Sequence, residues 1–148
     1  MRNPARMSCR AAGLHRLAAL AMLLVAACSG TTSTAPGTPV HVTLHDFRIA
    51  TATTSVAAGP LAFDVWNAAP ATHEFVIVRT DLPADRLPIA ADGLSVDEDQ
   101  LDAVGEVSEV DTGTTAQLPL SLPPGHYVFF CNLDGHYLGG MHAGLDVT

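Results

Sequence analysis

The sequence predicts an all-β fold, and three observations support this prediction. Short segments rich in β-branched and aromatic residues alternate apolar with polar side chains. Turn-forming residues separate these segments at intervals typical of an antiparallel sandwich or barrel. The region with this pattern, residues 40–148, is long enough for one domain and contains no internal repeat.

The expected strands can be taken in order along the chain. Residues 40–47 place Val42 and Leu44 on one face and polar side chains on the other, and Asp46 falls in the same parity as the apolar residues. Residues 61–67 alternate in the same way. Further strands are expected at residues 75–78, 114–122, 126–131 and 144–147, with a Pro-Pro-Gly turn at residues 123–125.

One segment departs from the strand pattern. Residues 80–105 are rich in Asp, Pro and Ala. They predict a long connection outside the sheets, with a short helix or helical turn around residues 96–104.

The N-terminal segment has the features of an export signal. Residues 1–27 begin with a basic stretch and continue into an uncharged apolar run that is short for a membrane-spanning helix. Small residues precede Cys28, as in a bacterial lipobox, which predicts a lipid on Cys28 as the mature N-terminus. A plain secretory signal is the alternative. Residues 28–39 are small, polar and contain Pro and Gly, which predicts a flexible tether before the domain at residues 40–148.

The mature chain is strongly acidic. Without residues 1–27 it keeps Arg48, Arg79 and Arg86 against 15 acidic residues and has no Lys. A formal charge of −12 argues against binding to nucleic acid or anionic lipid, and favours a partner with a basic surface. Plain solubility is the alternative explanation of the charge.

Cysteine usage limits the kind of site. Cys9 lies in the predicted signal and Cys28 in the lipobox, so Cys131 alone remains in the domain and no disulfide can form within it. A lone thiol in an exported protein is vulnerable to oxidation unless it is buried or bound. A paired-cysteine dinuclear copper site is excluded for the same reason.

Three donor side chains lie five residues apart in one Gly-rich segment. Cys131, His136 and Met141 follow one expected strand and precede the next, so a single loop carries all three. Each alone has an ordinary structural explanation, but these are the one Cys and the one Met of the mature domain. Thiolate, imidazole and thioether form a soft set that suits copper, and zinc could also bind the Cys and His.

A second imidazole from a distant strand would complete a trigonal plane. His73 precedes the expected strand 75–78 and is the natural choice. His41 and His45 lie about 13 Å apart on an extended strand and cannot chelate together. His126 is expected to be exposed, and His142 to point away from the metal toward solvent. The predicted ligands are thus His73, Cys131 and His136 in the plane, with a weak axial Met141.

These segments resemble a known family. Residues 125–147 (GHYVFFCNLDGHYLGGMHAGLDV) resemble the copper-loop hairpin of the cupredoxins, the plastocyanin-like blue copper proteins. Residues 67–78 (NAAPATHEFVIV) are similar to the segment that carries their first histidine. The resemblance covers residues 40–148. It implies a Greek-key β-sandwich that holds one copper ion near one end and transfers electrons.

The sequence also departs from that family. Members often carry an Asn after the first histidine, which ties the two ligand loops together, whereas this chain has Glu74. Its side chain either points away from the metal or ligates it. Two more residues separate Cys131 from His136 than in the shortest members. Asn67, Glu74 and Asn132 are therefore predicted to lie around the ligands, with Asn132 stiffening the loop.

Two functions remain open at this point. The resemblance implies a carrier of single electrons. The N-terminal segment predicts that it is exported and lipid-anchored on the periplasmic or extracellular face of the cell membrane, and the acidic charge predicts that its partner is a redox protein with a basic surface. A protein that sequesters or delivers copper would use the same ligands. No nucleophile–base motif is present, so an enzyme is not expected.

Overall fold

The computed structural model describes residues 37–148. The predicted signal peptide, the lipidated Cys28 and most of the tether at residues 28–39 lie outside the described residues. Within them, no helix has the length and apolar character needed to cross a membrane. The first strand begins at Thr38, two residues before the expected start of the domain at Val40.

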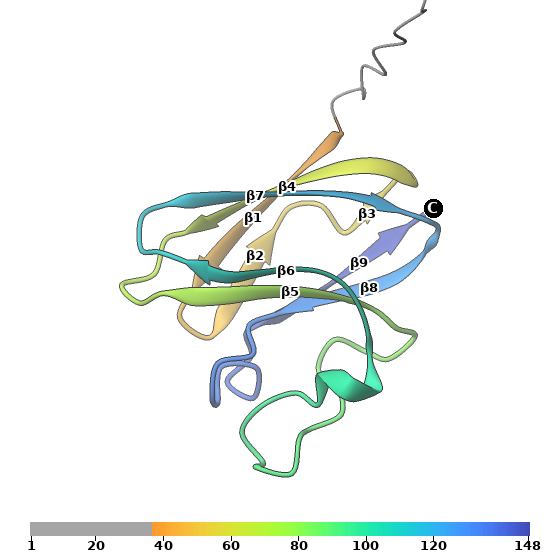
Figure 1. Cartoon of the computed structure of the whole chain (residues 1–148). Helices are drawn as coiled ribbons and strands as arrows, with labels where there is room; N and C mark the ends of the chain where they lie inside the picture. The colour runs from red at the N-terminus through yellow and green to blue at the C-terminus, as the bar shows by residue number, and fades with distance from the viewer. Residues whose placement is uncertain (1–36) are drawn as a thin grey trace, which may run out of the picture. The chain divides into compact units, whose positions relative to one another are not determined.

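The described chain forms two stacked sheets (Figure 1). One has the order β2-β1-β4-β7 and the other β3-β9-β8-β5-β6. The bounds of the elements are β1 Thr38–His45, β2 Arg48–Thr51, β3 Ser55–Val56, β4 Gly59–Asn67, β5 His73–Arg79, the 3-10 helix η1 Glu98–Gln100, β6 Asp102–Val110, β7 Thr115–Leu122, β8 Gly125–Phe130 and β9 His142–Val147. The predicted all-β sandwich is therefore confirmed.

The sheets are mixed, which corrects the expectation of purely antiparallel pairing. β1 pairs with β4 in parallel, and β3 pairs with β9 in parallel. Parallel neighbours need a crossover connection. The chain provides it by leaving the first sheet after β2, forming β3 in the second sheet, and returning as β4. Side chains alternate in the same way in parallel and antiparallel strands, so the sequence pattern did not reveal which strands pair in parallel.

The space between the sheets is filled by the side chains that the alternation predicted. Val42 and Leu44 of β1 and Phe63 of β4 are almost fully buried. Phe63 packs near Phe75 and Phe129 of the other sheet, with ring centroids 6.2 and 6.4 Å away. We call this set the inner core. It also contains Cys131 and Met141, which places the sulfur donors at the edge of the sandwich interior.

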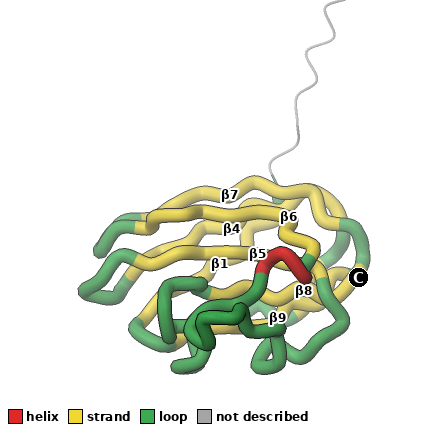
Figure 2. Tube along the Cα trace, turned by 60° about the horizontal axis from the view of Figure 1, so that its bottom comes forward, coloured by secondary structure: helices red, strands yellow, loops and turns green. Residues whose placement is uncertain are grey.

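A second apolar cluster lies on the opposite face of the β3-β9-β8-β5-β6 sheet. The long connection between β5 and β6 and the loop between β8 and β9 lie side by side against this face (Figure 2). We call this set the outer cluster; its buried members are Val76, Val78, Leu87, Val96, Val128, Phe130 and Tyr137. β5 and β8 are thus covered on both faces, which explains their continuous apolar runs.

The helical turn predicted around residues 96–104 is present as η1, Glu98–Gln100. The chain then enters β6 at Asp102, inside the segment that was expected to be a connection outside the sheets. β6 is a largely exposed edge strand that pairs with β5 through two register shifts. A Cβ on Gly105 would lie 2.8 Å from the side chain of Leu120, so glycine lets β6 approach β7. Acidic residues and Gly are poor strand formers, and pairing with β5 decides the outcome.

Candidate metal centre

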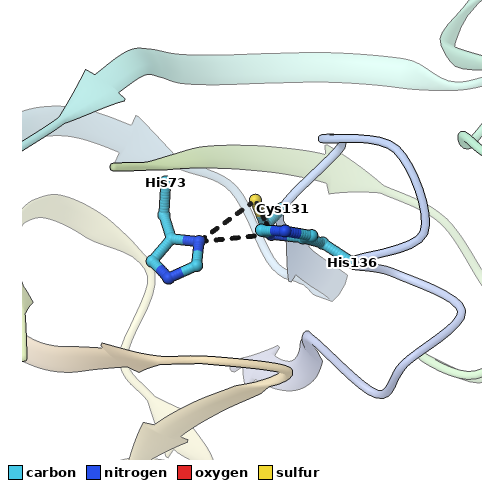
Figure 3. A group of neighbouring side chains, drawn as sticks. All are labelled: His73, Cys131 and His136. Atoms are coloured by element: carbon cyan, nitrogen blue, oxygen red, sulfur yellow. Dashed lines mark hydrogen bonds between the residues drawn. The ribbon is translucent and has the colours of Figure 1, made fainter. Parts of the chain in front are cut away.

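Three of the four predicted donors meet at one end of the sandwich (Figure 3). His73 opens β5, Cys131 directly follows β8, and His136 lies in the loop that leads to β9. Nδ1 of His73 is 3.2 Å from Nδ1 of His136. Sγ of Cys131 is 3.9 Å from the first of these nitrogens and 3.5 Å from the second. Two imidazoles and a thiol therefore face one point.

The triangle of donor atoms has the size of a metal site. A point equidistant from the three donor atoms lies about 2.1 Å from each, within the range of about 2.0–2.3 Å for bonds from a first-row metal to N or S. His73 and Cys131 are fully buried and His136 is half-buried. Met141 is also fully buried, belongs to the inner core together with Cys131, and would serve as a fourth donor. The residues present fit one copper ion.

The loop between β8 and β9 is closed by its own backbone. The Cys131 N–H donates to the Met141 carbonyl at 3.1 Å, and the Met141 N–H donates to the His136 carbonyl at 3.0 Å. Gly135 and Gly140 have positive φ angles of 77° and 107°, which side chains rarely adopt. These bonds and turns fold the loop so that its three donors converge.

Asn67 fixes the approach to the other histidine. This side chain is fully buried at the end of β4. Its Nδ2 donates to the carbonyls of Ala71 and Val110, both at 2.7 Å, and its Oδ1 accepts from the Ala69 N–H at 2.9 Å. The amide therefore joins the loop before His73 to β6 of the opposite sheet, in the supporting position that the sequence predicted.

The long connection is fastened to the ligand loop by two side chains. Asn132 accepts from the Val96 N–H at 2.6 Å and donates to the Glu98 carboxylate at 2.7 Å. The hydroxyl of Tyr137 accepts from the Leu87 N–H at 2.8 Å and donates to the Ala84 carbonyl at 2.9 Å. Asn132 thus stiffens the loop by tying it to a distant segment, and Tyr137, which sequence reasoning missed, does the same.

Glu74 contributes its backbone to the site. Its N–H points at Sγ of Cys131, 3.4 Å away, the role of a hydrogen-bond donor to sulfur. Its carboxylate does not belong to the group of converging donors. Burial raises the pKa of this carboxyl, and the nearby Glu106 and Glu98 raise it further. Of the two possibilities left open by the sequence, the structure does not place this carboxylate among the converging donors.

The two buried donors are held in their uncharged forms. Burial lowers the pKa of His73, and the neighbouring His136 lowers it further, while Asp46 opposes both. Burial also raises the pKa of the Cys131 thiol, against the backbone N–H groups of Leu133 and Glu74. A metal that binds here must displace the thiol proton, and the bound cation then stabilises the buried thiolate.

A two-residue turn that sequence reasoning missed touches both histidines. Asp46 and Phe47 connect β1 to β2. Oδ1 of Asp46 is 3.3 Å from Nε2 of His73, and the ring of Phe47 meets the ring of His136 edge-on with centroids 5.3 Å apart. One signal was available, because Asp46 is an acid that falls in the parity of the buried residues Val42 and Leu44.

The remaining histidines lie outside the cluster. His41 is exposed beside Asp64, at 3.3 Å. His126 is partly exposed and its Nδ1 is 2.7 Å from Asp146. His142 was expected to face solvent, and this was wrong: its ring is half-buried and packs against Tyr137 with centroids 5.1 Å apart. Tyr137, a member of the outer cluster, therefore shields one side of this ring from solvent.

Comparison with solved structures identifies related folds. No protein-family model and no curated protein sequence matches the chain. The chain is similar to reduced auracyanin from the photosynthetic bacterium Roseiflexus castenholzii, with 22% identity over 76% of this chain and 98% of that one, at a TM-score of 0.59.

Two further solved structures have a similar fold. Auracyanin A, a "blue" copper protein of Chloroflexus aurantiacus, is 19% identical over 75% of this chain and all of that one, with a TM-score of 0.53. Rusticyanin from Thiobacillus ferrooxidans is 17% identical over 76% and 79%, with a TM-score of 0.54. These likenesses confirm the fold that the sequence resemblance implied.

Proposed function

Because this chain has the cupredoxin fold and gathers two imidazoles, a thiol and a thioether at one end of it, we propose that it is a type 1 copper protein that carries single electrons. The observation that carries the proposal is the triangle formed by Nδ1 of His73, Nδ1 of His136 and Sγ of Cys131. Auracyanin A, which shares the fold, is described as a blue copper protein.

The residues would act by holding their positions. Copper, when bound, supplies a change of one electron between two oxidation states. His73, Cys131 and Met141 are fully buried, so the protein excludes water from three sides of the site. The Glu74 N–H directed at sulfur would stabilise the thiolate. A scaffold braced at both ligand segments needs little rearrangement when the charge of the ion changes.

The exposed side of the site suggests where electrons would pass. His136 is the one donor of the triangle that reaches the surface. Phe47 in the adjacent turn and Leu133 and Leu138 in the same loop are exposed apolar side chains. A partner that docks on these side chains would approach the edge of the His136 ring across an apolar surface.

The charge of the protein supports a basic partner. Three arginines stand against 15 acidic residues in the predicted mature chain. The negative electrostatic potential of such a protein accelerates encounters with a cationic redox protein, and salt weakens this attraction. We propose that export and a lipid on Cys28 hold the domain at the outer face of a membrane beside such partners. Electron exchange should slow as ionic strength rises, whereas a rate independent of salt would exclude steering by charge.

The first experiment is the visible and EPR spectrum of the protein loaded with Cu(II). A type 1 site requires an intense band from the Cys131 thiolate, lost in Cys131→Ser and altered in His136→Gln. His41→Gln is the matched control, because His41 is exposed and outside the cluster. Copper bound without the intense band would contradict the proposal.

Copper sequestration or delivery is the alternative function, since the ligands would be the same. The rigid support of both ligand segments favours the electron carrier. A reversible redox couple with fast electron self-exchange is expected for a carrier. Transfer of the ion to a copper-free acceptor protein, together with slow self-exchange, would favour delivery instead.

A further inference from the structure

The β1–β2 turn carries two unusual features beside the metal centre. Phe47 has a φ angle of 56° and is the one non-glycine residue with positive φ among residues 37–148. In a two-residue turn this position normally requires Gly or Asn. In the same described region, Nε2 of His73 is the one buried side-chain nitrogen or oxygen without a hydrogen bond. Both features lie where the turn meets the donors.

Phe47 packs against two glycines of the ligand loop, where a side chain in place of either glycine would crowd it. A Cβ on Gly139 would lie 2.2 Å from the Phe47 ring, and a Cβ on Gly140 would lie 3.2 Å from its carbonyl oxygen. The two glycines therefore leave room for this residue. Its ring is about half-exposed and packs edge-on against His136. A strained backbone that brings an exposed aromatic ring onto a donor indicates a functional position.

Asp46 faces the other imidazole. Its Oδ1 lies 3.3 Å from Nε2 of His73, without the alignment of a hydrogen bond. An ionised carboxylate only accepts, so a proton on Nε2 is favoured there. Histidines that bind metals commonly donate their second N–H to a carboxylate, which fixes the ring and its tautomer.

The contact between Nδ1 of His73 and Nδ1 of His136 determines which of the two rings donates a hydrogen bond to the other. A neutral imidazole carries one N–H, and two Nδ1 atoms 3.2 Å apart share a hydrogen bond only if one of them is protonated. If Asp46 keeps the His73 proton on Nε2, then Nδ1 of His73 is the acceptor and Nδ1 of His136 is the donor. The buried histidine is thereby ready for a metal, while half-buried His136 can exchange its proton with water.

We propose that the Asp46–Phe47 turn positions both imidazole donors, with Asp46 selecting the His73 tautomer that leaves Nδ1 free and Phe47 holding the His136 ring in place. This inference rests on the proposed metal site but not on electron transfer. Neither residue touches the expected position of the ion, so both are positioning residues.

The test for Asp46 uses the metal-free protein. NMR correlation of imidazole nitrogens with their carbon-bound protons, at a pH where both rings are neutral, should show His73 protonated at Nε2 and His136 at Nδ1. Asp46→Ala should mix the tautomers, and Asp46→Asn should restore the preference in part because its carbonyl still accepts. Asp64→Ala is the matched control, since Asp64 stands at the same 3.3 Å from His41. A His73 tautomer unchanged in Asp46→Ala would overturn the role of Asp46.

The test for Phe47 uses Phe47→Asn, because Asn tolerates positive φ and keeps the turn folded. The ring protons of His136 should lose the shift caused by the aromatic ring, and copper affinity in chelator competition should fall about 10–100-fold, as for other supports of a ligand. Trp66→Ala, which removes another half-exposed aromatic ring, should change neither. Unchanged affinity in Phe47→Asn would overturn its role.

The outcomes separate this inference from the proposed function. If copper-loaded wild type lacks the intense thiolate band, the type 1 assignment fails. The tautomers of the metal-free protein still decide whether Asp46 positions His73.

Discussion

The inner core and the outer cluster cover the two faces of one sheet but are built by different means. The inner core comes from strands that alternate apolar and polar residues, and burial of these side chains stabilises it. The outer cluster joins β5 and β8 to Leu87 and Val96 of an irregular connection. Tyr137 and Asn132 fix that connection by hydrogen bonds to its backbone. The inner core therefore sets the stability of the fold, whereas the outer cluster holds the loop that carries His136.

The largest effect is expected in the inner core. Phe63→Ala removes a fully buried ring that packs near Phe75 and Phe129. The free energy of unfolding should fall by about 3–5 kcal/mol, a large part of the typical 5–15 kcal/mol of a domain. Denaturant unfolding of the metal-free protein measures this. The control, Trp66→Ala on the same strand, should change it little, and equal losses in both variants would contradict the comparison.

The next largest loss of stability is expected where the Asn67 side chain joins the two sheets. Asn67→Ala leaves the carbonyls of Ala71 and Val110 and the Ala69 N–H without their partner. We expect the free energy of unfolding to fall by about 2–3 kcal/mol in total, because a buried group left unpaired costs about 1–3 kcal/mol and the bond to Ala71 is only partly buried. Copper retention should fall with it.

Gln117→Ala is the matched control for Asn67→Ala, because its amide makes one exposed bond to Asp64. Loss of stability without faster release of copper would show that Asn67 supports the sandwich but not the His73 segment.

A smaller and more local effect is expected in the outer cluster. Asn132→Ala removes the bonds to Val96 and Glu98, at a cost of about 1 kcal/mol per bond to global stability. Amide hydrogen exchange should accelerate at Val96 and along the long connection, while Phe63 in the inner core keeps its protection. Uniform acceleration at both places would mean that the two clusters open as one unit.

The smallest effect is expected in how the stability of the protein depends on pH, and it involves the Tyr137 hydroxyl. Burial raises the pKa of the Tyr137 hydroxyl above its ordinary 10.0. The folded protein then holds this proton more tightly than the unfolded chain, so the contribution of Tyr137 is complete below a pH of about 10 and is lost as the pH rises through the raised pKa.

Tyr137→Phe should therefore be less stable than wild type at neutral pH, because two hydrogen bonds are lost. The difference between the two proteins should narrow above pH 10.0. Urea midpoints across this range measure it. A difference that stays constant with pH would argue that the hydroxyl ionises equally in both states.

Part of the fold and of the site could be predicted because the signals were local. Strands such as residues 61–67 carry their alternation in their own sequence, and Cys131, His136 and Met141 lie in one loop. The prediction failed at β6, whose acidic, Gly-containing sequence forms a strand through its pairing with β5. It also failed for the parallel pairs, which depend on the path of the chain between sheets.

By itself, the sequence determined the all-β class, the burial parity of the main strands and the identity of the converging donors, since residue type and spacing decide these. The tertiary structure was needed to show that the Glu74 carboxylate is not among the converging donors, that the long connection packs against the ligand loop, and that Asp46 and Phe47 lie beside the two imidazoles. These contacts join residues far apart in the chain. Their geometry depends on how the sheets stack, which no local pattern encodes.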